Sequence, residues 1–219
     1  MNNMQAFMFI SINRDTAHMM ASKNYVLYGA GAVTLFELLK QGKLTCDGKS
    51  VSAVSSASAG SEIQDEVNIM VINKGSPYKM RTLISRVPYK VRGISRRLME
   101  DLEDSGMIKL EQGRFLGLIP YNRYLVTNEG RHEKLKNELK NIVIAGNRQA
   151  DPDMAFLISL LLVCRILKRL FSKEEKRELR EVFKSIGKFS FFETLDCNAT
   201  AVLKAARDVI AAAEAAAAA

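Results

Sequence analysis

The chain has 219 residues, 47% of them hydrophobic, and its 32 Lys and Arg exceed its 24 Asp and Glu, giving a net charge of +8. This apolar content excludes a disordered chain, and the length predicts one domain or a tight pair of domains. The longest apolar run, 154–164, is too short to span a bilayer, and no secretory signal pattern occurs, so we expect a cytosolic protein. The positive charge favours an anionic partner: nucleic acid, a membrane surface or a phosphorylated ligand.

Hydrophobic spacing predicts a mainly α fold: a single helical-bundle domain with two small β-hairpins. In the first half of the chain, apolar residues recur at helical spacing and glycine-containing turns follow them. Asp47-Gly48 suits the tight turn of a hairpin. The expected elements of this half are helices over 4–12, 32–39 and 62–72, the last closed by a turn that contains Gly75, and a hairpin over 43–52.

The second half begins with a helix that follows Pro88 and ends at Gly106. Alternating residues then predict a second hairpin, with strands 107–111 and 114–118 and its turn at Gln112-Gly113. Later helices are expected over 135–143, 154–171 and 173–186.

Three sequence signals mark later helix starts: Asp151-Pro152, the Ser172 and Glu175 capping box, and Asn198. We expect residues 1–210 to form the domain. The Ala-rich segment 211–219 is expected to be a helical tail without a chemical role.

Residue types that carry metal binding and nucleophilic catalysis are few and scattered. No CxxC, HxxxH or GxSxG pattern occurs. The two histidines, His18 and His132, lie in polar stretches that we expect to be exposed. A zinc site, a disulfide framework and a Ser or Cys nucleophile have no support, so we expect no metal, no cofactor and no enzymatic activity.

Gly29-x-Gly31 follows an apolar segment and precedes a helical pattern, as in a dinucleotide-binding loop. The third glycine position is Thr34, and no βαβ units follow it. Glycines that allow helices to pack closely are the simpler interpretation, and a dinucleotide enzyme is a distant alternative.

The helix after Pro88 carries Arg92, Arg96 and Arg97 beside its apolar stripe. With the hairpin that follows, it has the local order of a winged-helix module, whose arginines would contact nucleic-acid phosphates. An ordinary solvated basic face is the simpler interpretation. The same arginines suit the headgroups of an anionic membrane surface.

The returning arm of this hairpin is unusually apolar, with four large side chains: Phe115, Leu116, Leu118 and Ile119. An apolar hairpin beside a basic helix suits reversible membrane contact. The same side chains could pack on the bundle or on a second subunit, so the residues leave lipid contact and homo-oligomer contact both open.

The order of motifs resembles the Golgi phosphoprotein 3 family, which includes a yeast vacuolar-sorting homologue and bacterial relatives. The similarity covers residues 4 to about 210 and is carried by five segments: MQAFMFISINRD, GAGAVTLFELLKQGKL, RRLMEDLEDSGMI, RFLGLIPYNRYLVT and DPDMAFLISLLLVCRIL. The stretch FLGLIP…RY is the most specific of them.

The resemblance implies a non-enzymatic peripheral adaptor that binds phosphatidylinositol 4-phosphate on the cytosolic face of Golgi membranes. It also implies a role in vesicle trafficking and glycosyltransferase retention, with glycosyltransferase cytosolic tails and coatomer as partners. The family's headgroup pocket uses one tryptophan and three arginines, which fall on Ser22, Gly31, Arg92 and Ser95. Only Arg92 keeps the family residue, so we expect Arg92, Arg96 and Arg97 to hold headgroups with weak lipid selectivity.

Overall fold

The computed structural model describes residues 1–115 and 119–218, without the side chains of residues 114, 115, 119 and 120. It confirms the mainly α prediction, because its sheets are small and antiparallel. The described helices are α1 (Asn3–Ile10), α2 (Lys23–Lys40), α3 (Glu62–Lys74), α4 (Met80–Lys90), α5 (Ile94–Asp104), α6 (Glu129–Ile144), α7 (Pro152–Val163), the 3-10 turn η1 (Leu167–Leu170), α8 (Lys173–Glu178), α9 (Arg180–Ile186) and α10 (Cys197–Ala218).

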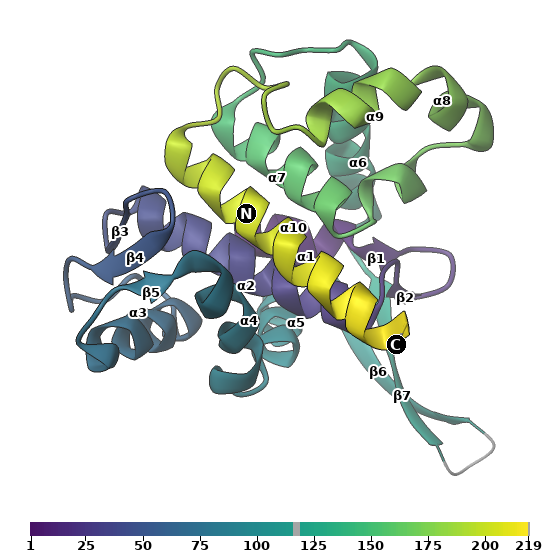
Figure 1. Cartoon of the computed structure of the whole chain (residues 1–219). Coiled ribbons are helices and arrows are strands. Elements are labelled where there is room, and N and C mark those ends of the chain that lie inside the picture. The colour runs from purple at the N-terminus through teal and green to yellow at the C-terminus, as the bar shows by residue number, and fades with distance from the viewer. Residues whose placement is uncertain (116–118, 219) are drawn as a thin grey trace.

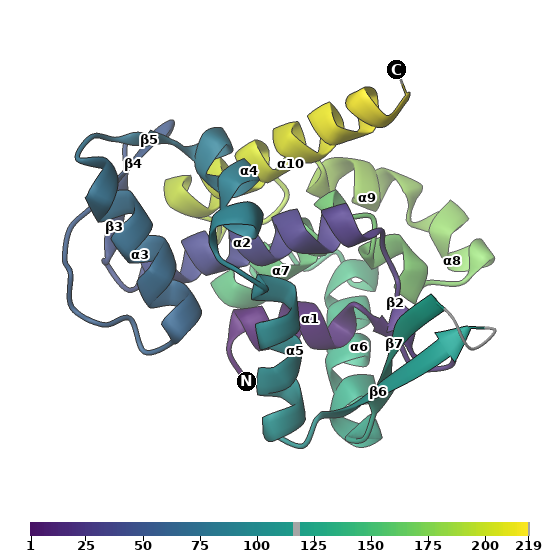
Figure 2. The same cartoon turned by 90° about the horizontal axis from the view of Figure 1, so that it is seen from below.

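Helices α1 and α2 form the centre of the molecule (Figures 1 and 2). The run from Phe7 to Ile10 is fully buried, which confirms the predicted buried first helix. Helix α2 contacts α1, α3, α4, α5, α7 and α10. A helix that is apolar on most of its surface is stable only inside such a shell of other helices.

Local signals place several helix ends where the sequence predicts them. Ser172 and Glu175 form the predicted capping box at the start of α8. The side chain of Asp151 accepts hydrogen bonds from the first backbone N–H groups of α7, with Pro152 at its first position. Gly75, at φ 67°, ends α3 in the left-handed conformation.

Two predicted long helices are wrong in extent. The apolar helix expected over 154–171 ends at Val163, where Arg165 adopts φ 63°. The Arg165 N–H donates to the Leu162 carbonyl, and the Ile166 N–H donates to the Leu161 carbonyl. Glycine usually occupies the left-handed position of such a helix end, which an arginine occupies here. The helix expected over 173–186 divides at Leu179 into α8 and α9.

Several helix starts also differ from prediction. Helix α2 begins nine residues before 32, at Lys23. Helix α4 was not predicted, because Pro88 suggests a boundary, whereas it lies inside the last turn of α4. The start of α10 is capped by Asp196, whose side chain accepts from the Ala199 N–H, and not by Asn198.

The described strands are β1 (Ile12–Asn13), β2 (His18–Met19), β3 (Leu44–Cys46), β4 (Ser50–Ala53), β5 (Tyr78–Lys79), β6 (Ile108–Phe115) and β7 (Ile119–Val126). The first predicted hairpin is confirmed as β3 and β4, to which β5 adds a third strand. The pair β1 and β2 was not predicted.

The second hairpin is present, but its predicted register is wrong. Gln112 and Gly113 lie inside β6, paired with Asn122 and Tyr121 of β7. The Tyr121 ring covers Gly113 so closely that a Cβ there would overlap it. Gly113 therefore makes room for a cross-strand aromatic ring and does not form the turn.

Candidate functional site

The segment from β5 to the first turn of α5, residues 79–97, carries seven Lys and Arg and no Asp or Glu. Helix α4 buries Met80, Leu83, Ile84 and Val87 against α2 and α10. Because these side chains occupy one face, the cations of the helix lie on its other side. Five of the seven make no ion pair within the described part of the chain: Lys79, Arg81, Arg86, Lys90 and Arg92.

The junction between α4 and α5 holds Arg92 at the surface. Val91 and Ile94 are almost fully buried and anchor the chain on both sides of it. Gly93, at φ 69°, makes the turn into α5, a conformation that a residue with a Cβ rarely adopts. Arg92 is therefore exposed on a short segment whose two ends are fixed.

Arg97 faces inward, although it lies only five residues after Arg92. Its guanidinium donates to Glu66 Oε1 at 2.6 Å and to Glu62 Oε2 at 3.1 Å. The hydrogen bond to Glu66 is the main reason why the pKa of Arg97 is raised. Arg97 thus joins α5 to α3, and two carboxylates already balance its charge.

Arg96 is intermediate between the exposed Arg92 and the paired Arg97. Its Nε donates to Glu100 Oε1 at 2.7 Å, one helical turn along α5, and its side chain is 82% exposed. An exposed pair of this kind contributes at most about 0.5 kcal/mol, so an external anion can replace Glu100 at little cost.

An exposed aromatic side chain completes this surface and was not singled out by sequence reasoning. Tyr89 is 70% exposed between Pro88 and Lys90. Its hydroxyl lies 3.4 Å from the hydroxyl of Tyr28 on α2. That contact is the largest cause, and burial the second, of a pKa of Tyr28 raised to about 12. The alternation Tyr89-Lys90-Val91-Arg92 is the signal that could have revealed the site, since it interleaves an aromatic ring with cations.

The profile of the protein family described as Golgi phosphoprotein 3 (GPP34) matches residues 4–213. The chain belongs to the Golgi phosphoprotein 3 family. Membership associates it with Golgi function in general. A search of curated proteins found no significant match. Within the residues that the structure describes, no helix is long and apolar enough to cross a membrane.

Three of the four positions at which the resemblance places a headgroup pocket carry uncharged residues here. Ser22 is exposed immediately before α2, and Ser95 is half-buried in the first turn of α5. Gly31 is buried in α2, where a Cβ would lie 3.4 Å from the Ile84 carbonyl oxygen. Gly31 thus faces α4 inside the helix bundle, and Arg92 is the only one of the four positions that carries a charge.

The second hairpin was predicted to contact lipid or another subunit. Its strands extend away from the helices (Figures 1 and 2). At its base the Tyr124 N–H bonds to the Ala17 carbonyl at 2.8 Å. Phe115 and Ile119 face each other in the last described backbone pair, whereas Leu116 and Leu118 lie outside the described residues. The contact role of these four residues stays a prediction.

The dinucleotide interpretation is wrong. Gly29 and Gly31 both lie well inside α2 and not in a turn between a strand and a helix, and the described residues contain no βαβ unit. A Cβ at Gly29 would overlap the Phe7 ring and lie 2.9 Å from Cys164 Sγ. Gly29 therefore serves helix packing, as the simpler interpretation predicts, whereas a Cβ at Gly31 would be close to ordinary contact.

One expectation about the histidines is also wrong, because His132 is only 4% exposed. Its ring meets the Phe9 ring edge-on at 4.9 Å between centroids, and burial lowers its pKa. His18 is exposed, as expected. No cluster of His, Cys, Asp and Glu suited to a metal ion occurs among the described residues.

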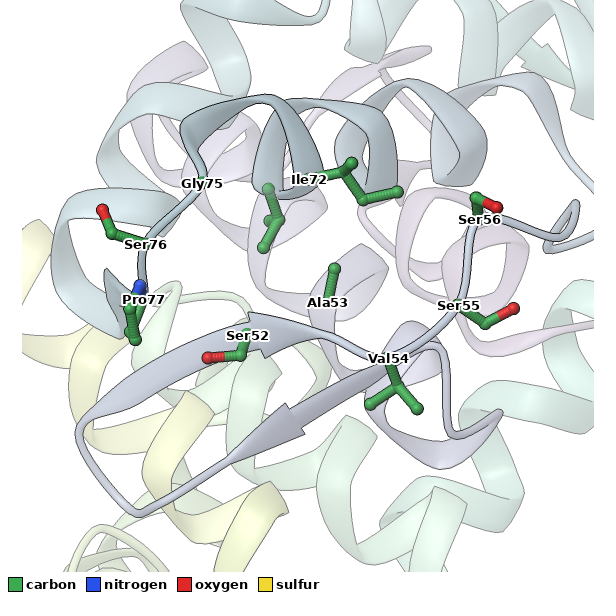
Figure 3. Close-up of a pocket in the computed structure, with 10 residues that line it drawn as sticks. Ser52, Ala53, Val54, Ser55, Ser56, Ile72, Gly75, Ser76 and Pro77 are labelled. Carbon is green, nitrogen blue, oxygen red and sulfur yellow. The ribbon is translucent and has the colours of Figure 1, made fainter.

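A cavity of about 440 Å³ lies between β4 and the end of α3 (Figure 3). Serines, backbone groups and the partly exposed side chains of Val54 and Ile72 line it. None of its lining residues is charged or has a titratable side chain. The cavity therefore offers neither catalytic chemistry nor a counter-charge for an anionic headgroup.

Proposed function

We propose that this chain is a non-enzymatic peripheral membrane adaptor that binds an anionic phosphoinositide lipid, with phosphatidylinositol 4-phosphate as the family's lipid. It would act in Golgi vesicle trafficking and in glycosyltransferase retention, on the cytosolic face of the membrane. Anionic membrane lipid, glycosyltransferase tails and coatomer are the partners that family membership suggests.

One observation carries the proposal: five cations that make no ion pair with any described residue lie between β5 and the start of α5, together with the exposed Tyr89. Tyrosine is favoured at the membrane–water boundary, because its ring is apolar and its hydroxyl is polar. Each nearby Lys or Arg contributes about 1 kcal/mol at an anionic leaflet. We assign the headgroup contact to Arg92, with Arg96 in support, and a structural role to Arg97.

The same geometry argues against the winged-helix alternative. A recognition helix buries one face on its own domain and uses side chains of the other face to contact DNA. On the outer side of α5, Arg97 turns to Glu62 and Glu66 of α3, and Arg96 pairs with Glu100, so two of the three predicted phosphate contacts already meet carboxylates. We therefore do not propose nucleic-acid binding.

Liposome flotation of the double variant Lys90→Gln/Arg92→Gln tests the proposal. Two lost cations should weaken binding to acidic vesicles by about 2 kcal/mol, or roughly 30-fold. The matched control is Arg131→Gln/Lys134→Gln on α6, which removes the same charge from two exposed residues without ion pairs in the described chain. Wild-type binding should also fall as salt exceeds about 0.15 M, where the screening length is about 8 Å.

Equal loss in both double variants would show that only net charge matters and would remove the assigned site. Tight binding to duplex DNA without flotation would overturn the membrane proposal altogether. Circular dichroism of each variant excludes loss of folding as the cause.

A further inference from the structure

A second basic surface is formed by residues between 162 and 214, where α7, η1, α9 and α10 meet. Helices α7, α9 and α10 are labelled in Figure 1. These elements enclose a cleft of about 510 Å³. Six cations and one carboxylate, that of Glu214, line it, and the cations are Arg165, Lys168, Arg180, Lys184, Lys188 and Arg207. The cleft shares none of its lining residues with the proposed membrane surface.

The floor of the cleft is apolar and well packed. Phe183, Phe189 and Ile210 are each no more than 5% exposed. The cations therefore surround a hollow with a defined shape, and are not spread over a flat helix face. A volume of this size is typical of pockets for small molecules.

Two of the cations are held in position by aromatic rings. The Arg207 guanidinium lies 4.9 Å from the centroid of the Phe189 ring and donates to the Gly187 carbonyl at 3.3 Å. The Lys168 ammonium lies 5.4 Å from the centroid of the Phe183 ring. These contacts orient the two charges without neutralising them.

Most of this positive charge has no counter-ion among the residues that the structure describes. Arg165 pairs with Glu214 at 3.4 Å, and Lys184 pairs with Glu181 at 3.5 Å. The other four cations make no ion pair with any described residue. Like charges gathered in one concavity repel one another, and a bound anion would relieve that repulsion.

The backbone of the cleft adds a further observation. Among the described residues, only Ala17, Arg165 and Phe189 combine a side chain with a positive φ, and two of these three line the cleft. Such conformations cost free energy and persist where surrounding structure enforces them. Here they place one cation and one ring that supports another cation.

We infer that this cleft binds a phosphorylated anion that carries at least two phosphate groups. A phosphate group carries about −1.5 to −2 charges at neutral pH, so two or three of them match the cations, whereas a carboxylate carries only one charge. Arginine offers planar paired donors and lysine a compact point charge, and both suit phosphate oxygens. The anion could be a soluble molecule or the headgroup of a lipid.

Calorimetric titration with inorganic tripolyphosphate tests the inference. Wild type should bind it saturably, and Arg180→Gln/Lys188→Gln should bind it at least about tenfold more weakly, since two charge-assisted contacts are lost. The matched control is Lys173→Gln/Arg177→Gln on α8, which also removes one Lys and one Arg that are exposed and unpaired in the described chain. Control affinity should stay within about twofold of wild type.

A variant that removes a negative charge from the cleft should have the opposite effect on binding. Glu214→Gln removes the one carboxylate that lines the cleft and frees Arg165. It should bind tripolyphosphate more tightly than wild type, by severalfold. A merely structural effect of substitutions in this region would weaken binding in both variants.

Thermal unfolding without ligand separates binding from folding. Arg180→Gln/Lys188→Gln relieves repulsion, so its Tm at low salt should be equal to or above that of wild type. No saturable binding by wild type, or equal weakening in the cleft and control variants, would overturn the inference.

Vesicles containing phosphatidylinositol bisphosphate identify the source of the anion. If it is a lipid headgroup, tripolyphosphate should release wild type from these vesicles, and the cleft variant should bind them less than the α8 control. If the anion is soluble, the cleft and control variants should float equally while their tripolyphosphate affinities still differ. The outcomes for the proposed membrane surface remain distinct, because Lys90→Gln/Arg92→Gln should leave tripolyphosphate affinity in the cleft unchanged.

Discussion

Two glycines in α2 offer a direct test of how the centre of the fold is packed. Gly29→Ala and Gly31→Ala make the same chemical change two residues apart in the same helix. At Gly29 the new methyl group would overlap the Phe7 ring and approach Cys164 Sγ to 2.9 Å, and both neighbours are fully buried. At Gly31 it would meet the Ile84 carbonyl oxygen at 3.4 Å and Val87 at 3.5 Å, which is close to ordinary contact.

The expected effects on the free energy of unfolding differ in sign. Alanine is favoured over glycine within a helix by about 1 kcal/mol, a gain common to both positions. Overpacking costs about 1–3 kcal/mol, and the ring overlap at Gly29 belongs at the upper end. Gly29→Ala should therefore lose about 2 kcal/mol, whereas Gly31→Ala should range from neutral to a gain of about 1 kcal/mol.

Urea unfolding followed by far-UV circular dichroism measures both values on one scale. Because the helix-propensity gain is common to the two variants, their difference reports the packing at Gly29 alone. In a Phe7→Leu background, Gly29→Ala should cost less free energy of unfolding than it does in wild type, since the shorter side chain leaves room for the methyl group. A Gly29→Ala variant as stable as Gly31→Ala would refute the packing of α1 and α7 against α2.

Three further predictions concern pH, the hairpin and lipid choice. Burial lowers the pKa of His132, so the unfolded chain binds a proton more readily than the folded chain as the pH drops below about 6.5. The urea concentration at the unfolding midpoint should therefore decrease as the pH is lowered through this range, and it should decrease less in His132→Leu than in wild type. Leu116→Ser/Leu118→Ser should weaken flotation or self-association, measured by light scattering, while circular dichroism stays native; outright unfolding would place these residues in the core. Wild type should prefer phosphatidylinositol 4-phosphate only weakly over lipids of equal charge, and Ser95→Arg, which restores a family arginine, should increase that preference in flotation; strong wild-type selectivity would contradict the pocket assignment.

The fold could be predicted wherever a local signal fixes a local structure. The Ser172 capping box, Asp151 with Pro152, and Gly75 each act within one helical turn, and each predicted end is present. Two of the errors arose where distant packing decides. Arg165 ends α7 in a conformation usually reserved for glycine, and Gly113 makes room for Tyr121 across the hairpin when glycine usually indicates a turn.

The binding surfaces show the same division between local and distant causes. Arg92 and Arg97 are both arginines on the same short segment, yet of these two only Arg97 meets carboxylates. Helix α3 brings Glu62 and Glu66 to it from more than thirty residues away in the sequence. Its sequence neighbourhood holds no hint of that pairing.

The cleft between α9 and α10 is harder still to predict, since its cations come from segments up to 42 residues apart and form no continuous motif. Even Glu214, in an Ala-rich segment expected to lack a chemical role, accepts a hydrogen bond from Tyr25 at 2.6 Å and faces Arg165. A net charge of +8 predicts an anionic partner but says nothing about where it binds. The location depends on where the fold gathers cations that meet no described carboxylate. Two such groups lie on α4 beside Tyr89 and in the cleft over Phe183 and Phe189.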